Sequence, residues 1–186
     1  MCRFITAVLP NDADIEKCVE VFRIHRRACA AYANPTLAVQ IGNQESSYCT
    51  TVGHCDCDTL LGSADLHGAA GPGKNTEAAA ARLRSKGWSE AKIARALGQR
   101  SEADSRPRSP IRGERQQAGL DEWCALIRDV LALRGVASIG LLIHQYSGGI
   151  DDEAIVLQKR EVVRARDLDE TILAAMRSDT IYEFRR

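Results

Sequence analysis

Three cysteines and one histidine are concentrated between Cys49 and Cys57, in the stretch Cys-Thr-Thr-Val-Gly-His-Cys-Asp-Cys. Thiolates and imidazoles bind soft metal ions, and thiolates are also nucleophiles. On a strand, Cys55 and Cys57 would share one face with their Cα atoms roughly 6.5–7 Å apart. That separation is awkward for a disulfide, but it lets both sulfurs reach one ion. Cys49 would lie on the same face, whereas His54 needs a bulge at Gly53 to join it.

This cluster predicts a zinc site, because zinc takes three or four thiolate or imidazole ligands in a tetrahedral arrangement. A further ligand is expected from Cys2, near the first strand. The spacing differs from that of paired Cys-x-x-Cys signatures, so two alternatives stay open. The cysteines could serve redox or nucleophilic chemistry, or pack as small apolar residues. The candidate metal ligands are Cys2, Cys49, His54, Cys55 and Cys57.

The apolar pattern predicts an α+β fold with a central mixed or antiparallel sheet flanked by helices. The run 139–143 is apolar throughout, which is typical of a central strand buried on both faces. Asn11 is the expected cap of the first helix, and 33–43 is expected to be an extended connection. Strands are predicted at 4–9 and 139–143, with 153–163 as the partner of the latter, and 48–61 is expected to be a strand or a hairpin. Helices are predicted at 11–29, 76–85, 89–97 with Ser89 as its cap, 116–133 and 168–176, and a tail packed on the core at 181–184.

We expect one domain over 1–186, with an inserted helical hairpin and flexible linker at 76–113. Within it, 101–113 is rich in arginine and serine and contains Pro107 and Pro110, a composition typical of a solvated linker. Residues 68–75 nearly match a phosphate-binding loop, but Asn75 stands where a magnesium-binding hydroxyl is needed. A plain loop followed by a helix is the preferred interpretation.

The hairpin at 76–100 resembles the first part of a helix-turn-helix domain. Between Arg82 and Arg115 basic residues outnumber acidic ones ten to four, which suits phosphate contacts. The next segment, 101–110, cannot form a recognition helix because of its prolines and composition. A lid or a partner-docking arm is therefore preferred, and DNA binding through 76–100 is kept as an alternative.

Two further residues are secondary candidates for a site, His144 and Tyr146. They alternate along the end of the central strand, beside the glycine turn at 148–149. Functional sites are often built where strands run into loops. The competing interpretation is a structural histidine that is simply hydrogen-bonded.

The composition excludes several classes of protein. The formal net charge is zero, so no overall attraction to nucleic acid or to a membrane surface is expected. No apolar run reaches the length of a membrane span, and 1–10 lacks the pattern of a signal peptide. The odd cysteine count, seven, points to a reducing compartment. We therefore expect a cytoplasmic protein whose partner is another protein.

Two resemblances add expectations. Met1-Cys2-Arg3-Phe4 resembles the start of class II glutamine amidotransferases, in which removal of methionine exposes a cysteine nucleophile with its own amino group as base. That family's fold consists of two facing sheets built from many strands, and fewer strands than that are predicted for this chain. Several motifs together are similar to an uncharacterised family of bacterial proteins of this length, which implies one intact family unit and no known activity. These motifs are Met1-Cys-Arg-Phe-Ile, Ala33-Asn-Pro, Gly53-His-Cys-Asp-Cys57, Gly87-Trp-Ser-Glu-Ala-Lys-Ile93 and Tyr146-Ser-Gly-Gly149.

The sequence therefore predicts a small cytosolic accessory or interaction protein with a cysteine-rich zinc site. The rival class is a thiol-dependent enzyme that uses Cys2 or a cysteine of the Gly53–Cys57 motif. Whether the chain is an enzyme stays open at this point.

Overall fold

The computed structural model describes the chain except for residues 1, 58, 63–83, 85–87, 96–109 and 152. The chain divides into two units, which are described separately. One combines Met1–Asp65 with Gln116–Arg186 and contains the sheet; the other is Leu66–Arg115. The phosphate-loop-like stretch 68–75 and most of the predicted hairpin and linker lie outside the described residues.

A six-stranded sheet in the order β2-β3-β1-β4-β6-β5 forms the centre of the first unit. β5 runs parallel to β6, and the other neighbouring pairs are antiparallel, so the sheet is mixed. The predicted α+β class is confirmed. The strands are β1 (Cys2–Pro10), β2 (Ala30–Ala31), β3 (Glu45–Cys49), β4 (Ser138–Tyr146), β5 (Lys159–Arg164) and β6 (Thr180–Arg185).

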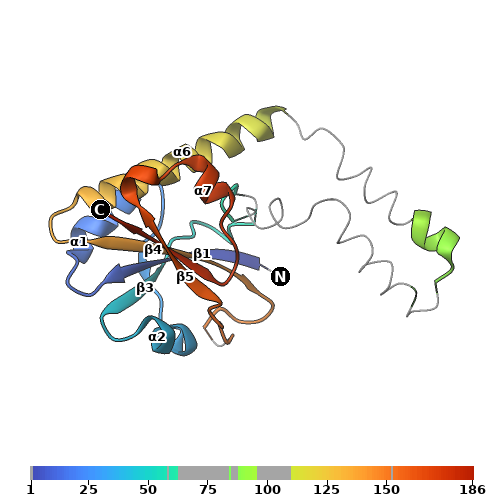
Figure 1. Cartoon of the computed structure of the whole chain (residues 1–186), viewed down its shortest axis with the longest axis horizontal. Coiled ribbons are helices and arrows are strands. Elements are labelled where there is room, and N and C mark those ends of the chain that lie inside the picture. Colours follow the sequence, from blue (N-terminus) through green and yellow to red (C-terminus); the bar gives the residue numbers. More distant parts are fainter. Residues whose placement is uncertain (1, 58, 63–83, 85–87, 96–109, 152) are drawn as a thin grey trace. The chain divides into compact units, whose positions relative to one another are not determined.

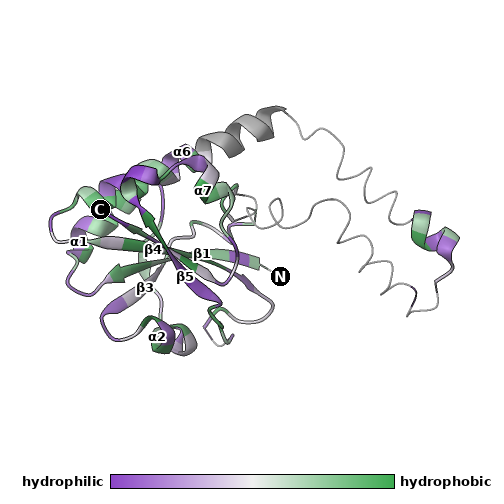
Figure 2. Ribbon diagram, in the orientation of Figure 1, coloured by the Kyte–Doolittle hydropathy of each residue, from purple (hydrophilic) through white to green (hydrophobic). Residues whose placement is uncertain are grey.

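Helices cover both faces of this sheet (Figure 1). On one face α1 and α6 pack with α7 over a large apolar core, and on the other α2 covers a smaller one. Figure 2 shows apolar residues along the central strands and the sheet-facing sides of the helices. The helices are α1 (Ile15–Ile24), α2 (Pro35–Ile41), α6 (Pro110–Ala132), the short 3₁₀ turn η1 (Ala165–Asp167) and α7 (Glu170–Ala174).

The two central strands explain why the sheet has cores on both faces. Alternate residues of a strand point to opposite faces. In β1, Ile5 belongs to the larger core and Val8 to the smaller. Neighbouring Leu141 and Leu142 of β4 divide in the same way, which confirms the prediction of a strand buried on both faces.

The start of the first helix and the 33–43 segment differ from expectation. The side chain that caps α1 is Asp14, which accepts the N–H of Lys17, whereas Asn11 bonds the carbonyl of Asn43. The predicted connection contains helix α2, which Asn34 caps through the N–H of Leu37. A proline directly after a capping asparagine favours a helix start, so the sequence does contain a signal for this helix.

Several other predicted boundaries are wrong. β3 ends at Cys49, so 50–57 is a loop and not a continued strand. The predicted strand 153–163 is reduced to β5, which pairs with β6 and not with β4. The expected tail 181–184 is part of strand β6. α6 begins at Pro110, inside the predicted linker, because proline is well tolerated in the first turn of a helix.

The described part of the second unit includes one helical turn from Glu90 to Arg95. The N–H of Ile93 bonds the carbonyl of Ser89, which agrees with the predicted helix start at Ser89. The Lys92 ammonium lies 4.1 Å from the centre of the Trp88 ring. Among the described residues, no helix combines the length and apolar character required to cross a bilayer.

Candidate metal centre

Cys2, Cys55 and Cys57 bring three thiols together at the beginning of β1. Their sulfur atoms all lie within 4.8 Å of one another, and all three side chains are half-buried. The three thiols are free, with no disulfide between them. Such a group of sulfurs could hold a metal ion, and it unites the first strand with the loop that follows β3.

The loop reaches this position by bonding to the edge of β1 after β3 has ended. Thr50 still donates its N–H to the carbonyl of Ile5, over 3.0 Å. The chain then leaves the sheet, turns at Gly53 with φ of 97°, and returns so that the N–H of Asp56 bonds the carbonyl of Arg3 over 2.8 Å. Cys55 and Cys57, on either side of Asp56, are therefore held beside the start of β1.

Two side chains take over the role of a neighbouring strand here. The Asp56 carboxylate accepts the N–H of Ile5 over 3.0 Å, and Cys57 Sγ accepts the N–H of Arg3 over 3.1 Å. An amide hydrogen bond to sulfur stabilises negative charge on it, as second-shell bonds do in metal sites. The bond from Arg3 thus fixes Cys57 Sγ beside the start of β1.

A tight turn behind Asp56 fixes the loop from its other side. The Asp56 carbonyl accepts both the N–H of Thr59, over 3.0 Å, and its hydroxyl, over 2.8 Å. The N–H of Gly62 bonds that same hydroxyl over 3.0 Å. A Cβ at Gly62 would lie 2.0 Å from the Asp56 carbonyl oxygen, so only glycine fits there.

Asp56 is a buried carboxylate, only 2% exposed, between two candidate ligands. Burial raises its pKa, although bonds from Thr51 and the Ile5 amide and the charge of Arg27 act in the opposite direction. The guanidinium of Arg27 lies 3.6 Å from the carboxylate and 4.6 Å from the centre of the Trp123 ring, which connects the loop to α6. The carboxylate is thus turned toward the protein interior and is not one of the clustered metal-binding groups.

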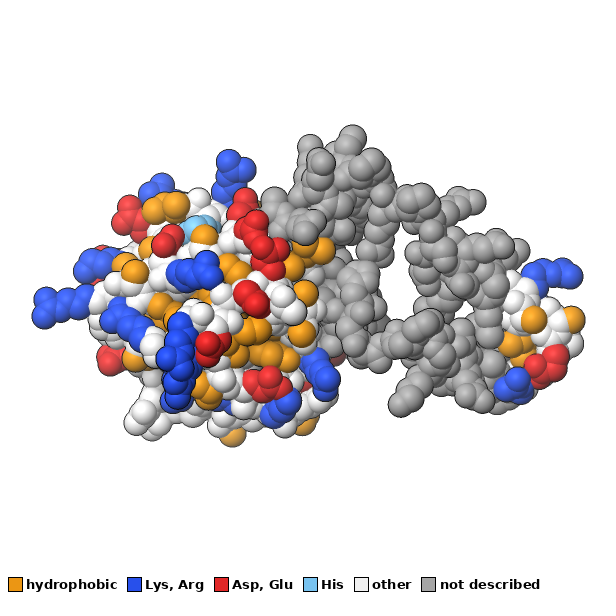
Figure 3. Space-filling model, turned by 45° about the horizontal axis from the view of Figure 1, so that its top comes forward, with side chains coloured by type: hydrophobic (Ala, Val, Ile, Leu, Met, Phe, Trp, Pro, Cys, Tyr) orange, Lys and Arg blue, Asp and Glu red, His pale blue; other side chains and the backbone are white. Residues whose placement is uncertain are grey.

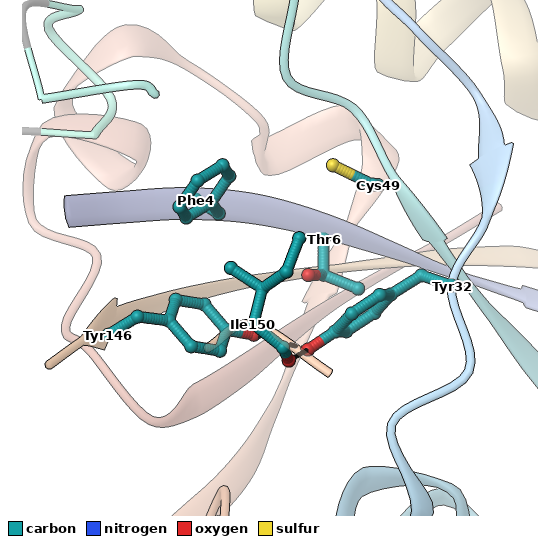
Figure 4. Close-up of a pocket in the computed structure, with 6 residues that line it drawn as sticks. All are labelled: Phe4, Thr6, Tyr32, Cys49, Tyr146 and Ile150. Carbon is teal, nitrogen blue, oxygen red and sulfur yellow. Dashed lines mark hydrogen bonds between the residues drawn. The ribbon is translucent and has the colours of Figure 1, made fainter. Parts of the chain in front are cut away.

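The structure does not bring all five predicted ligands together. Within the described part of the chain, the group of potential ligands contains Cys2, Cys55 and Cys57 and neither Cys49 nor His54. His54 is exposed on the loop. Cys49 lines a hollow of about 10 Å³, room for about one water molecule. Figure 4 shows this hollow, with the rings of Tyr32 and Tyr146 pointing toward each other next to Ile150.

The other cysteines belong to the packed interior. Cys18 and Cys124 are buried in the larger core, with Cys29 packed against it. Burial raises the pKa of Cys29 to about 12, and it also raises the pKa values of Cys18 and Cys124. These thiols stay protonated at neutral pH, so they act as small apolar residues.

His144 and Tyr146 lie on β4, in a separate polar network. His144 Nδ1 is 2.5 Å from the carboxylate of Asp179, and its Nε2 is buried 3.9 Å from that of Glu153. The Tyr146 hydroxyl meets that of Tyr32 over 2.6 Å. Burial raises the pKa of Tyr146, so this phenol remains neutral. Neither residue belongs to the group of possible metal ligands identified among the described residues.

Sequence reasoning missed the residues that build the centre around the thiols. The sequence alone does not single out Asp56, Arg3 or Gly62. A carboxylate between two candidate ligands and a glycine five residues after the last cysteine were the available signals. Their meaning depends on the return of the loop to β1, which the strand prediction for 48–61 concealed.

The function of this site has to be inferred from its geometry alone. No family model, no curated protein and no solved structure matches this chain. On the face shown in Figure 3, acidic and basic side chains are intermixed over the unit that contains the sheet. What the site defines by itself is a three-cysteine cluster able to hold a metal ion.

Proposed function

We propose that the chain is a small accessory protein in which Cys2, Cys55 and Cys57 hold a zinc ion as thiolates. The supporting observation is the approach of the three sulfurs to within 4.8 Å of one another. In a zinc tetrahedron with Zn–S bonds of about 2.3 Å, neighbouring sulfurs are about 3.8 Å apart. A contraction of at most about 1 Å would therefore close the three sulfurs on an ion.

The chemistry of the surrounding residues favours a soft ion. Thiolate ligands favour zinc and Cu⁺ over magnesium and calcium, which prefer oxygen. The carboxylate between Cys55 and Cys57, that of Asp56, is occupied by Ile5, Thr51 and Arg27. Three described thiols would leave zinc one more position, for water, another residue of the chain or a group from a partner protein. The last possibility is consistent with an interaction role in the cytoplasm.

Metal analysis combined with thiol counting separates this role from a thiol enzyme. We expect about one zinc per chain in protein purified without chelator, and three additional reactive thiols after chelation, because bound thiolates are protected. A thiol-dependent enzyme would instead contain no metal and would have one thiol that reacts quickly in the native protein. Absence of both signals would leave the cysteines as packing residues.

A further inference from the structure

Arg3 has a buried positive charge, and no acidic side chain among the described residues forms an ion pair with it. The residue is 8% exposed. Its Nη1 donates to the carbonyl of Gly62 over 3.1 Å, and its Nε and Nη2 donate to the side-chain oxygen of Gln145 over 3.3 and 3.2 Å. Both described partners are neutral. Burial of a charge without a counter-charge is costly, so a negative group near the Arg3 guanidinium would stabilise it.

Two other arginines of the same unit, the half-buried Arg27 and the more exposed Arg160, have carboxylate partners. Arg27 lies 3.6 Å from Asp56. Arg160 bonds Glu45 over 2.6 Å and Glu183 over 3.3 Å. Of these three arginines, Arg3 is the one without a carboxylate partner among the described residues. It lies next to the cysteine cluster.

The backbone of Arg3 is bonded directly to the loop that carries two of the thiols. Arg3 follows Cys2 in β1, donates its N–H to Cys57 Sγ and accepts the N–H of Asp56. The guanidinium bonds Gly62, whose Cα packs against the Asp56 carbonyl. Its positive charge thus lies at Gly62, in the turn that follows Cys55 and Cys57 and packs against the Asp56 carbonyl.

We propose that Arg3 is the buried counter-charge of an anionic metal–thiolate centre and shifts its selectivity toward Cu⁺. This inference rests on the proposed metal-binding function. Three thiolates leave one negative charge with Zn²⁺ and two with Cu⁺, and attraction to a fixed positive charge grows with the charge of the complex. Cu⁺ is also a preferred ion of thiolate ligands. The centre is thus a site for thiophilic ions, with zinc and Cu⁺ as the ions to compare.

The experiment compares zinc and Cu⁺ affinities of the full chain, measured by competition with chromophoric chelators. Arg3→Gln should weaken zinc binding about tenfold, the lower end of second-shell effects, and Cu⁺ binding by a larger factor. Arg3→Lys should retain the Cu⁺ to zinc affinity ratio of the wild type, because it keeps the charge. Arg160→Gln is the control: it removes the same charge beside Glu45, which pairs with the far end of β1 at Pro10, and should leave both affinities unchanged.

Several outcomes would overturn the inference. Equal losses for both ions in Arg3→Gln, or equal losses in Arg3→Gln and Arg3→Lys, would mean that Arg3 only holds the Gly62 turn. Unchanged binding in Arg3→Gln would overturn the inference while leaving the metal site intact. If Arg3→Gln does not fold, a Cu⁺ to zinc ratio in Arg3→Lys that differs from the wild type contradicts it. A wild type that binds neither ion overturns the proposed function as well.

Discussion

The backbone N–H of Ile5 donates to the carboxylate of Asp56 over 3.0 Å, at the edge of β1 beyond the last residue of β3. A side chain here does what the carbonyl of a neighbouring strand does elsewhere in the sheet. Because Asp56 lies between Cys55 and Cys57, the bond that completes the sheet edge also fixes two of the three clustered thiols. Stability of this edge and occupancy of the centre are therefore expected to change together.

Replacement of Asp56 tests this relationship. Asp56→Ala leaves the buried N–H of Ile5 without an acceptor, so it should lower the free energy of unfolding by about 1–3 kcal/mol and weaken metal binding. Asp56→Asn keeps an acceptor oxygen and should cost less. Urea unfolding of both variants measures the difference, and equal losses would show that the Ile5 bond is unimportant.

The raised pKa of Asp56 predicts a specific pH dependence. Folding raises this pKa from 3.8, mainly through burial, so the folded chain keeps the proton to higher pH than the unfolded chain. The stability from Asp56 is complete below 3.8 and is lost as pH rises through the folded pKa. Wild type should therefore lose stability relative to Asp56→Asn as pH rises from 3.8 toward neutrality. The opposite slope in denaturant titrations would show that Arg27 and the hydrogen bonds outweigh burial.

Gly62 should not tolerate a side chain. The Cβ of Gly62→Ala would lie 2.0 Å from the Asp56 carbonyl oxygen, a backbone atom that cannot rotate away. We expect a loss of about 2 kcal/mol or more, with weaker metal binding. Gly119→Ala in α6 is the matched control, because its Cβ meets nothing within 4 Å and alanine favours a helix by about 0.5–1 kcal/mol. Similar thermal shifts in the two variants would refute the crowding at Gly62.

Asp179 combines an unusual backbone with the bond to His144. Its φ is 60°, which glycine adopts freely and alanine does not. Asp179→Gly removes the carboxylate and relieves the backbone strain of about 1 kcal/mol, whereas Asp179→Ala removes the carboxylate and keeps that strain. Asp179→Ala should thus melt at the lower temperature. In both variants NMR should show a changed His144 ring environment; an unchanged His144 signal would mean that the bond to Asp179 does not exist in solution.

The sequence was most informative where burial dictates structure. The continuous apolar run at 139–143 predicted the central strand, because only a strand covered on both faces needs no polar residues. The helical spacing of Cys18 and Phe22 predicted the buried face of α1. Cys2, Cys55 and Cys57, which the structure brings together, are three of the five metal ligands that the sequence predicted.

The positions of the remaining residues depend on contacts between distant segments. Side chains of 48–61 would alternate between two faces only on a strand, whereas Cys55 and Cys57 are placed by bonds that the amides of β1 donate to Asp56 and Cys57. Arg3 and Gly62 acquire meaning only when the loop returns to that strand. Local sequence carries no record of such a return, so neither their roles nor the separation of Cys49 from the cluster could be foreseen.

The central claim is that Cys2, Cys55 and Cys57 form the metal centre, and zinc content per chain in matched cysteine variants tests it most directly. Cys57→Ser replaces a clustered sulfur, whereas Cys49→Ser changes a half-buried cysteine outside the described cluster. The account predicts about one zinc per chain in wild type and in Cys49→Ser, and none in Cys57→Ser, because structural zinc binding needs its full ligand set. Equal zinc content in the two variants, or none in the wild type, would contradict it.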